Sequence, residues 1–489
     1  MRSLNNINSS PVYLFLLPIF FVLHGFTQNF HFVETKDAAL LALKYLLCAA
    51  VVGAVFYLIF RDFSKAALMT FFIFLFLFFF GNIQDLLKEI APESFLTKYI
   101  FLIPFFILVV IGVFIVIRRR RSFVRITGYL NILFLVLIPI DVVTLVSLSL
   151  RDKTGAGKQA DAMFSNCENC PRPDVYIIML DEYAGLDGLK NILGYDNKPF
   201  YDTLTARGFH TVVNSHSNYN YTLYSTASTL NMEYMDQEAT RDTRRGYKYA
   251  VNKIEDNKAI NYFRSKGYKF FNYSPFTMGR QSAPVVGSFV PTGTKLISSG
   301  TLFSRLEKDV LLNAANRFNM TSYLRKAMYI TLHDNEKLFG LTMSKVAAGG
   351  TPKVVYTHLL MPHYPYYHSA DGELRSFEVL RNSSLSDSAG YLGYLQHTNS
   401  RITTLIDHIL SRSAQPPIIA LMSDHGYRYY HSNDTKYYFS NLLSVHLPGK
   451  NYEAFGNSMS SVNFFRAIFN SEFRQTLPYL PDQRFIIDF

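Results

Sequence analysis

Long runs of apolar residues fill the first third of the chain, and polar residues return only in short gaps between them. Five runs reach the length that a helix needs to cross a bilayer, roughly 17–25 mostly apolar residues. Their approximate ranges are 11–30, 39–60, 65–83, 95–117 and 126–149. A soluble α-helical core would need five neighbouring helices that are apolar on every face, so the pattern favours membrane spans.

The charges in the gaps predict how these spans are oriented. Two gaps are basic and hold Arg61, Lys65, Arg118, Arg119, Arg120, Arg121 and Arg125. The other gaps are acidic or mixed and hold Glu34, Asp37, Asp85, Glu89 and Glu93. Because positive loops stay on the cytoplasmic side, we expect a cytoplasmic N-terminus. An odd number of spans then places everything after about residue 150 outside the membrane.

The composition changes after the last apolar run. Residues 151–173 are rich in Lys, Gly, Ala, Ser, Asn and Pro, which is typical of a linker. We therefore expect a five-span transmembrane domain over 1–150, a juxtamembrane linker over 151–173 and an extracytoplasmic globular domain over 174–489. The linker holds Cys167 and Cys170, which form either a local disulfide or two unpaired thiols. Structural zinc is disfavoured because no second cysteine pair follows.

Three short apolar runs in the globular part have the length and residue types of buried strands. They are Val175 to Leu180, Val354 to Leu360 and Ile418 to Met422. Helical patterns lie between them, most clearly at about 387–412, where apolar residues recur three and four positions apart. Strands that alternate with helices predict an α/β domain with a mainly parallel sheet and flanking helices.

Acidic and histidine residues stand where these strands end. The first strand leads into Asp181 and Glu182, and the third leads into Asp424 and His425. The second strand carries His358 and leads to His363, Tyr364 and Pro365. In parallel sheets the ligand site lies at the carboxyl ends of the strands. Carboxylates and imidazoles gathered there predict a site for a divalent cation such as Zn²⁺ or Mn²⁺.

A hydroxyl-rich stretch from Asn218 to Met232 supplies a candidate nucleophile. It changes from loop character to a helical pattern near Thr222. A threonine at a helix N-terminus can bind a metal through its oxygen, beside backbone N–H groups that can hold an anionic ester. The alternative is that Thr222 only caps the helix.

Taken in order, these motifs resemble the alkaline phosphatase superfamily and, within it, the sulfatase-like branch. The resemblance covers about residues 174–450. It consists of M-L-D-E-Y, the hydroxyl-rich helix start, P-H-x-P-Y at 362–366, S-D-H-G at 423–426 and N-L-L-S-V-H-L-P-G at 441–449. Five spans followed by an outward domain of this kind resemble lipoteichoic acid synthases and lipid A phosphoethanolamine transferases.

The resemblance implies roles for several residues. Asp181, Asp424 and His425 match the family's metal ligands, and one tightly bound divalent metal is expected. Thr222 matches a threonine that is esterified during turnover and also contacts the metal. His363 matches a histidine that binds substrate or assists proton transfer to the leaving group. Four further polar residues are candidates for contacting the substrate or supporting the ligands, with a purely structural role left open: Glu182, His358, Arg428 and His431.

The formal net charge of +11 adds little to this picture. Such an excess can indicate nucleic-acid binding, but much of it lies in the gaps between the apolar runs, where membrane topology explains it. We expect no nucleic-acid partner. The C/S-x-P-x-R motif of true sulfatases does not occur near Thr222. By resemblance, its absence disfavours sulfatase activity and favours a threonine that takes up a phosphoryl group.

The function we expect is transfer of a phospho-headgroup, of the phosphoglycerol or phosphoethanolamine type, from a membrane phospholipid to a glycan or lipid acceptor. The first alternative is a phosphodiesterase, phosphatase or sulfuric ester hydrolase that uses water as the acceptor. The second is an inactive membrane scaffold with the same fold. A transporter is disfavoured because the spans hold few ionisable residues. The expected location is the bacterial cytoplasmic membrane, with the catalytic domain on its periplasmic side.

Overall fold

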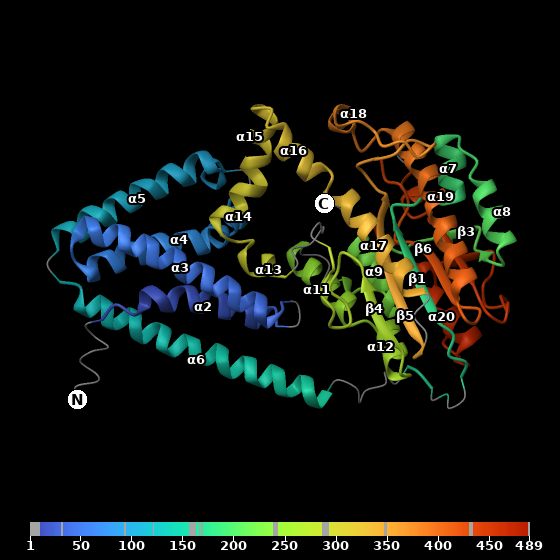
Figure 1. The fold of residues 1–489 in the computed structure, drawn as a ribbon, viewed down its shortest axis with the longest axis horizontal. Helices are drawn as coiled ribbons and strands as arrows, with labels where there is room; N and C mark the ends of the chain where they lie inside the picture. Colours follow the sequence, from blue (N-terminus) through green and yellow to red (C-terminus); the bar gives the residue numbers. More distant parts are fainter. Residues whose placement is uncertain are drawn as a thin grey trace. The chain divides into compact units, whose positions relative to one another are not determined.

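The computed structural model describes residues 10–487 apart from 31–32, 92–93, 121, 156–162, 166, 168–169, 238–242, 286–292, 347–349 and 430–433. The chain forms two compact units (Figure 1). The first comprises residues 1–156 and 291–324, and the second comprises residues 157–290 and 325–489.

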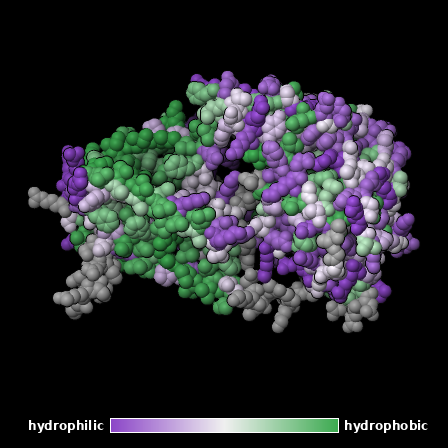
Figure 2. Space-filling model, in the orientation of Figure 1, coloured by the Kyte–Doolittle hydropathy of each residue, from purple (hydrophilic) through white to green (hydrophobic). Residues whose placement is uncertain are grey.

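Long apolar helices make up most of the first unit. They are α2 (Tyr13–Gln28), α3 (Thr35–Phe60), α4 (Phe63–Ile90), α5 (Tyr99–Arg119) and α6 (Val124–Gly155), with the short 3₁₀ turn η1 (Phe95–Thr97) before α5. Large apolar side chains on these helices are exposed, among them Leu47, Leu108 and Val143. Figure 2 shows the hydrophobic colour gathered over this unit. A surface of this kind suits lipid and not water.

Four of the five expected spans are helices that meet the length and composition of a membrane span, so the count of five is not confirmed. The helices α3, α4 and α5, together with Val124–Leu150 of α6, are long and apolar enough to cross a membrane. The helix α2 has 16 residues. At 1.5 Å per residue it is about 24 Å long, shorter than the roughly 30 Å hydrocarbon layer.

A later part of the chain also belongs to the first unit. It contains α13 (Lys295–Ser298), α14 (Leu302–Leu306), the π-helical turn η2 (Glu307–Leu311) and α15 (Leu312–Arg317). The next helix, α16 (Thr321–Met328), crosses the boundary at residue 324. The sequence pattern placed all these residues within the C-terminal domain because their helices are too short to show an apolar period. The structure instead groups 291–324 with the N-terminal helices.

A six-stranded mixed sheet lies at the centre of the second unit, in the order β2-β7-β6-β1-β5-β4. The strands are β1 (Val175–Asp181), β2 (His210–Thr211), β4 (Lys269–Tyr273), β5 (Lys353–Pro362), β6 (Ile418–Ser423) and β7 (Leu443–His446). The pairs β1·β5, β1·β6 and β4·β5 are parallel, whereas β7 runs antiparallel to both of its neighbours. The three predicted strands are thus confirmed, and they form the adjacent trio β6, β1 and β5.

Helices cover both faces of this sheet (Figure 1). Alternate β1 residues enter two different cores: Val175, Ile177 and Met179 enter one, and Tyr176, Ile178 and Leu180 enter the other. A strand buried on both faces has to be apolar throughout, which explains its continuous V-Y-I-I-M-L run. The first core includes side chains of α9 (Thr222–Asn231), α11 (Thr243–Glu255), α12 (Lys258–Ser265) and α20 (Ser461–Glu472). The second includes side chains of α7 (Leu186–Leu193), α8 (Lys198–Ala206), α17 (Ile330–Val346), α18 (Phe377–Asn382) and α19 (Ser388–Arg412).

The helix predicted at about 387–412 is confirmed as α19. The remaining elements are small. They are the parallel pair β3 (Asn214–His216) and β8 (Ser458–Ser460) and the 3₁₀ turn η3 (Thr435–Tyr438), which precedes β7.

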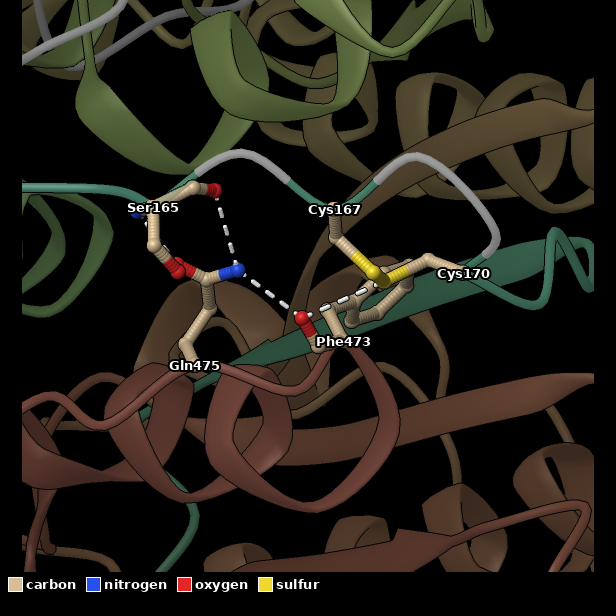
Figure 3. Close-up of a disulfide and its surroundings, with 5 residues drawn as sticks. All are labelled: Ser165, Cys167, Cys170, Phe473 and Gln475. Carbon is tan, nitrogen blue, oxygen red and sulfur yellow. Dashed lines mark hydrogen bonds between the residues drawn. A yellow bond between two sulfur atoms is a disulfide. The ribbon is translucent and has the colours of Figure 1, made fainter.

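The two linker cysteines form a disulfide, with their Cα atoms 5.6 Å apart (Figure 3). This resolves the alternative that the sequence left open. Cys170 Sγ lies 3.3 Å from the carbonyl oxygen of Phe473, just beyond α20. Nearby, the Ser165 backbone N–H donates to Gln475 Oε1 at 2.8 Å. The end of the linker is therefore fixed against the segment that follows α20.

A buried arginine ties α20 to two other segments of the second unit. Arg466 is 6 % exposed, and its guanidinium donates at 2.6 Å to the carbonyl oxygens of Pro478 and Met232. Met232 directly follows α9. The guanidinium thus satisfies backbone acceptors at the end of the helix that begins with Thr222.

We predict that Arg466→Met destabilises the full-length protein by about 2–4 kcal/mol, because it leaves both carbonyl oxygens without their donor. Thermal unfolding in detergent, followed by intrinsic tyrosine fluorescence, measures the effect as a lowered Tm. The matched control is Arg412→Met at the exposed end of α19, for which we expect a change within about 0.5 kcal/mol. Equal Tm values for the two variants would contradict the structural role of Arg466.

Candidate active site

Three neighbouring strands bring their polar ends to one edge of the sheet. In the register of the sheet, Leu180 lies beside Ser423, and Asp181 lies beside Pro362 after a bulge in the β1·β5 pairing. Asp424 and His363, the next residues along β6 and β5, therefore come to the same edge. Parallel strands have their carboxyl ends at one edge, so the convergence follows from the sheet topology.

Asp181, Asp424 and His425 form the tightest group of potential metal ligands in the described part of the chain. One ligand atom from each lies within 4.8 Å of the other two, and all three residues are buried. Both carboxylate oxygens of Asp181 and Oδ2 of Asp424 have no hydrogen-bond partner among the described residues. Buried carboxylates without donors are costly unless a cation neutralises them. The donor set of two carboxylates and an imidazole fits Zn²⁺ or Mn²⁺.

Backbone N–H groups hold the Asp424 carboxylate in place. The amides of Glu182 and His425 donate to Asp424 Oδ1 at 2.9 and 2.8 Å. Glu182 reaches this position with a left-handed φ of 60°. That conformation costs a non-glycine residue of order 1 kcal/mol and is tolerated where the surrounding contacts determine it. Both N–H groups therefore bind Oδ1 of Asp424, and Oδ2 is the oxygen that has no donor among the described residues.

The His425 ring has its tautomer set by a backbone carbonyl. His425 Nδ1 lies 2.8 Å from the carbonyl oxygen of Gly426, which can only accept, so Nδ1 carries the proton. Nε2 therefore presents its lone pair, 3.4 Å from Asp424 Oδ2 and 3.2 Å from Thr222 Oγ1. A neutral imidazole oriented through its other nitrogen is the usual form of a histidine metal ligand.

Close packing explains the glycine in S-D-H-G. A Cβ atom on Gly426 would lie 2.3 Å from the carbonyl oxygen of Ser440 and 2.6 Å from that of Tyr437. Both contacts are to backbone, which cannot move aside as a flexible side chain can. The absence of a side chain lets the turn that carries His425 lie against the segment leading into β7.

The candidate nucleophile lies at the first turn of α9. Thr222 is the first helical residue, Tyr221 occupies the N-cap position, and no side chain caps the helix. The reading of Thr222 as a simple N-cap is therefore wrong. Its hydroxyl instead faces His425 Nε2. The hydroxyl of Ser225, one turn later, donates to the carbonyl oxygen of Asp424 and joins α9 to the end of β6.

A second polar group surrounds the Glu182 side chain, which is fully buried. Glu182 Oε1 lies 3.3 Å from Arg428 Nε, and Oε2 lies 3.9 Å from His363 Nε2. Arg428 also donates to the carbonyl oxygen of Asn220 at 3.2 Å, and His363 Nδ1 lies 2.6 Å from the carbonyl oxygen of Tyr364. A cationic side chain and an imidazole thus gather around one carboxylate, an arrangement that can bind the oxygens of an anionic ester.

The remaining predicted residues differ in their placement. His358 is fully buried in β5, and its Nε2 lies 3.7 Å from Asp181 Oδ2, beyond hydrogen-bond distance. Its Nδ1 lies 3.4 Å from the Tyr356 hydroxyl. His358 therefore lies close to Asp181 but is not part of the ligand group. His431 lies outside the described residues.

The carboxylates of the site have shifted pKa values. Burial alone would raise the pKa of Asp181, but three nearby imidazoles outweigh it and lower that pKa. They belong to His363, His358 and His425. Burial raises the pKa of Asp424, and the negative charge of Asp181 raises it further. Two adjacent buried carboxylates disfavour each other's ionised form, and a bound cation would relieve this repulsion.

The two histidines of the site have pKa values shifted in opposite directions. Burial lowers the pKa of His425 to about 4, and the charge of Arg428 lowers it as well. His425 is therefore neutral at pH 7 and able to bind a metal. Burial would also lower the pKa of His363, but Asp181 and Glu182 reverse the effect and raise that pKa above its ordinary value. A histidine with a raised pKa is suited to donate a proton.

Sequence reasoning missed several residues that hold the site together. Tyr391 of α19 donates its hydroxyl to the carbonyl oxygen of Glu182 and accepts from the Ala184 N–H, both at 2.9 Å. Asn441 donates to the carbonyl oxygen of Ser423 at 2.8 Å. Tyr391 lies on the buried face of a helix and reads as a core residue, so the sequence carries no signal for its role. Asn441 begins the N-L-L-S-V-H-L-P-G motif, and its place in that motif is the only feature of the sequence that points to a role for it.

Comparison with known proteins shows structural likeness without close sequence relatives. No protein-family model matches the chain, and no curated protein sequence matches it. The C-terminal periplasmic domain of EcEptC from Escherichia coli is 12 % identical, with a TM-score of 0.42; the match covers 66 % of this chain and 92 % of that one.

Two further solved structures are similar at the same level. The C-terminal periplasmic domain of the phosphoethanolamine transferase EptC from Campylobacter jejuni is 13 % identical, with a TM-score of 0.39, covering 64 % of this chain and 93 % of that one. The phosphonate monoester hydrolase of Agrobacterium radiobacter is 14 % identical, with a TM-score of 0.38, covering 61 % and 73 %. Phosphoethanolamine transferases are among the proteins that the sequence motifs resemble. A likeness at this level assigns no activity, so the function is argued from the site itself.

We predict that His425→Ala weakens the binding of Zn²⁺ or Mn²⁺ by about 100-fold or more, because it removes a neutral nitrogen ligand from a small donor set. Isothermal titration of the metal-stripped full-length protein measures the Kd. The matched control is His333→Ala, since His333 is an exposed histidine of α17, and we expect it to leave the Kd unchanged. A His425→Ala protein that binds metal as tightly as the control would show that the cluster is not a metal site.

Proposed function

We propose that this protein is a metal-dependent enzyme that transfers a phospho-headgroup from a membrane phospholipid to a glycan or lipid acceptor through a phospho-Thr222 intermediate. One observation supports this proposal above all others. The hydroxyl of Thr222, at the N-terminal turn of a helix, lies 3.2 Å from a neutral imidazole nitrogen in a buried cluster of two carboxylates and a histidine. Such surroundings can activate an otherwise weak alcohol nucleophile.

The residues that would hold the divalent metal are Asp181, Asp424 and His425, with the Thr222 oxygen as a fourth contact. The carboxylate oxygens of Asp181 and Asp424 that have no donor, and the unprotonated Nε2 of His425, fit such an ion. When bound, a divalent cation such as Zn²⁺ or Mn²⁺ would lower the pKa of the threonine hydroxyl and offset negative charge on the phosphoryl oxygens.

The first half of the reaction forms one bond and breaks one bond at phosphorus. Thr222 Oγ1 releases its proton to solvent and bonds to the phosphorus of the lipid headgroup, while the bond from phosphorus to the diacylglycerol oxygen breaks. His363, whose pKa is raised, donates a proton to that departing oxygen. The positive end of the α9 helix dipole and the Arg428 guanidinium stabilise the phosphoryl oxygens.

The second half reverses this order with a new alcohol. A hydroxyl of the acceptor gives its proton to the now neutral His363 and attacks phosphorus. The phosphorus–Thr222 bond breaks, and the threonine oxygen regains a proton from solvent, while His363 keeps the proton of the acceptor and is ready for the next cycle. Glu182 acts as a positioning residue in both halves, because its carboxylate lies between Arg428 and His363.

The membrane helices support a lipid as the donor. The proposal includes five spans, with α2 as the first, a cytoplasmic N-terminus and a catalytic domain on the outer side of the membrane. Phosphoglycerol or phosphoethanolamine as the transferred group follows from the motif resemblance described above.

We predict that the full-length protein, incubated with Mn²⁺ or Zn²⁺ and a mixture of phospholipids, gains the mass of one phospho-headgroup on Thr222. Intact-protein mass spectrometry with peptide mapping measures the adduct, and its mass identifies the donor. Thr222→Ala should carry no adduct and lose at least about 1,000-fold in turnover, since it removes the hydroxyl that faces His425 Nε2. Thr404→Ala, at an exposed threonine of α19, is the matched control and should behave as the unchanged protein.

The same experiment separates transfer from hydrolysis. An adduct that disappears only when an acceptor glycan or lipid is added supports a transferase. An adduct that disappears as fast without an acceptor as with one is being hydrolysed by water, which favours a phosphodiesterase. Turnover of phospholipid by Thr222→Ala at the unchanged rate would contradict the proposed nucleophile in both cases.

A further inference from the structure

The segment Lys295–Met320, here called the docked segment, is inserted between strands β4 and β5 of the catalytic unit but packs with the membrane helices. The chain therefore passes between its two units three times, at residues 156–157, 290–291 and 324–325. A simple anchor followed by a soluble domain would need only one passage. The contacts and the exposed surface of the docked segment indicate why the chain makes the two additional passages.

Specific contacts fix the docked segment to the membrane helices. The Gly81 N–H, inside α4, donates to the carbonyl oxygen of Gly300 at 2.8 Å. A Cβ atom on Gly81 would lie 2.6 Å from that oxygen, so the backbones meet closely because Gly81 has no side chain. Arg305 donates to Asp85 Oδ2 at 2.7 Å, and the two side chains are mostly buried.

Further contacts come from the start and the middle of the docked segment. Ile297 is buried in a small apolar cluster with Val22 and Phe26 of α2. The Tyr99 hydroxyl, at the start of α5, donates to Asp309 Oδ2. The segment is therefore a bound part of the helical unit.

All these contacts lie toward one end of the helices. The helix α5 begins at Tyr99 and carries Arg118 and Arg119 in its last turn. The helix α4 begins at Phe63, and Asp85 lies in its last quarter. Val22 and Phe26 lie in the second half of α2. The docked segment thus binds the end of the bundle opposite to the arginines, which is the end expected on the outer face of the membrane.

The docked segment leaves an apolar stripe uncovered. Phe303 is 68 % exposed and Phe318 is 74 % exposed, and Val310 between them is also exposed. Phe303 lies in α14, Val310 in η2 and Phe318 directly after α15, so exposed apolar side chains occur along the length of the docked segment. Exposed apolar residues of α4 and α5 flank the docking contacts: Leu86, Ile90 and Ile100. Exposed apolar side chains thus occur both on the docked segment and on the helix ends that it binds.

We propose that the docked segment is embedded in the outer leaflet of the bilayer, with Phe303, Val310 and Phe318 in the boundary between headgroups and acyl chains. The partner is the phospholipid surface of the same membrane that the spans cross. Lys308 and Arg317 are exposed on the same segment and can reach lipid phosphates. The inference does not depend on the reaction that the catalytic unit carries out.

The proposal explains why the chain leaves and re-enters the catalytic unit around this segment. A segment held in the headgroup layer would tether the chain on both sides of it, because the sequence belongs to the second unit before residue 291 and after residue 324. This tether is additional to the connection that follows α6 in the sequence.

The absence of tryptophan from the chain permits a direct test. Phe318→Trp and Phe303→Trp, each in the full-length protein, introduce a single tryptophan at an exposed site. The proteins are reconstituted in phosphatidylcholine vesicles whose acyl chains carry bromine, which quenches tryptophan fluorescence on contact. Ile107→Trp, at an exposed site about 12 Å along α5 from Tyr99, is the control within the membrane. Leu374→Trp, at a 53 % exposed site in the catalytic unit, is the control in water.

We expect both docked-segment variants to lose fluorescence to brominated lipid by a fraction similar to that of Ile107→Trp, with emission at shorter wavelength than Leu374→Trp. Bromine near the headgroup end of the chain should quench them more than bromine near the chain terminus, with the reverse order for Ile107→Trp. Emission like that of Leu374→Trp without quenching would overturn the proposal. A shift to shorter wavelength without quenching would also overturn it, since protein and not lipid would then cover the stripe.

Discussion

The repulsion between two buried carboxylates is the constraint on which the candidate active site depends. Asp181 and Asp424 are each at most 1 % exposed, and three of their four oxygens have no donor among the described residues. Protein interiors tolerate such a pair only when a proton or a cation neutralises it. The sheet forces the pair together, because β1 and β6 are adjacent, parallel and in register. We propose a divalent cation as the neutralising group, because it would also fit the neutral, oriented imidazole of His425.

Much of this arrangement could be predicted from the sequence because it follows from local patterns. Continuous apolar runs identified β1, β5 and β6, and the polar residues after each run identified Asp181, Asp424, His425 and His363. The contributions that come from non-local contacts could not be predicted. The left-handed φ of Glu182 accompanies a hydrogen bond from its backbone N–H to the carboxylate of Asp424, a residue 242 positions later in the chain. The edge strands and the docked segment are too short to show a period, and only their partners determine where they pack.

The second polar group gives the site an asymmetry that suits two-step chemistry. One side holds the ligand cluster and the Thr222 hydroxyl, with its histidine kept neutral. The other side holds Glu182 between Arg428 and His363, with its histidine kept basic. Groups whose environments push their pKa values apart are those that can divide the roles of nucleophile activation and proton donation. The apolar helices of the first unit agree with the proposal that the donor is a membrane lipid.

The most direct test of the central claim is to locate the metal in the full-length protein. Crystals or particles prepared with Zn²⁺ should show one strong metal peak, by anomalous scattering or in a density map, between the side chains of Asp181, Asp424 and His425. The account predicts ligand distances of about 2.0–2.2 Å and the Thr222 oxygen within the same coordination sphere. A protein that is saturated with Zn²⁺ but holds it elsewhere, or a cluster that stays metal-free with its carboxylates hydrogen-bonded to each other, would contradict the account.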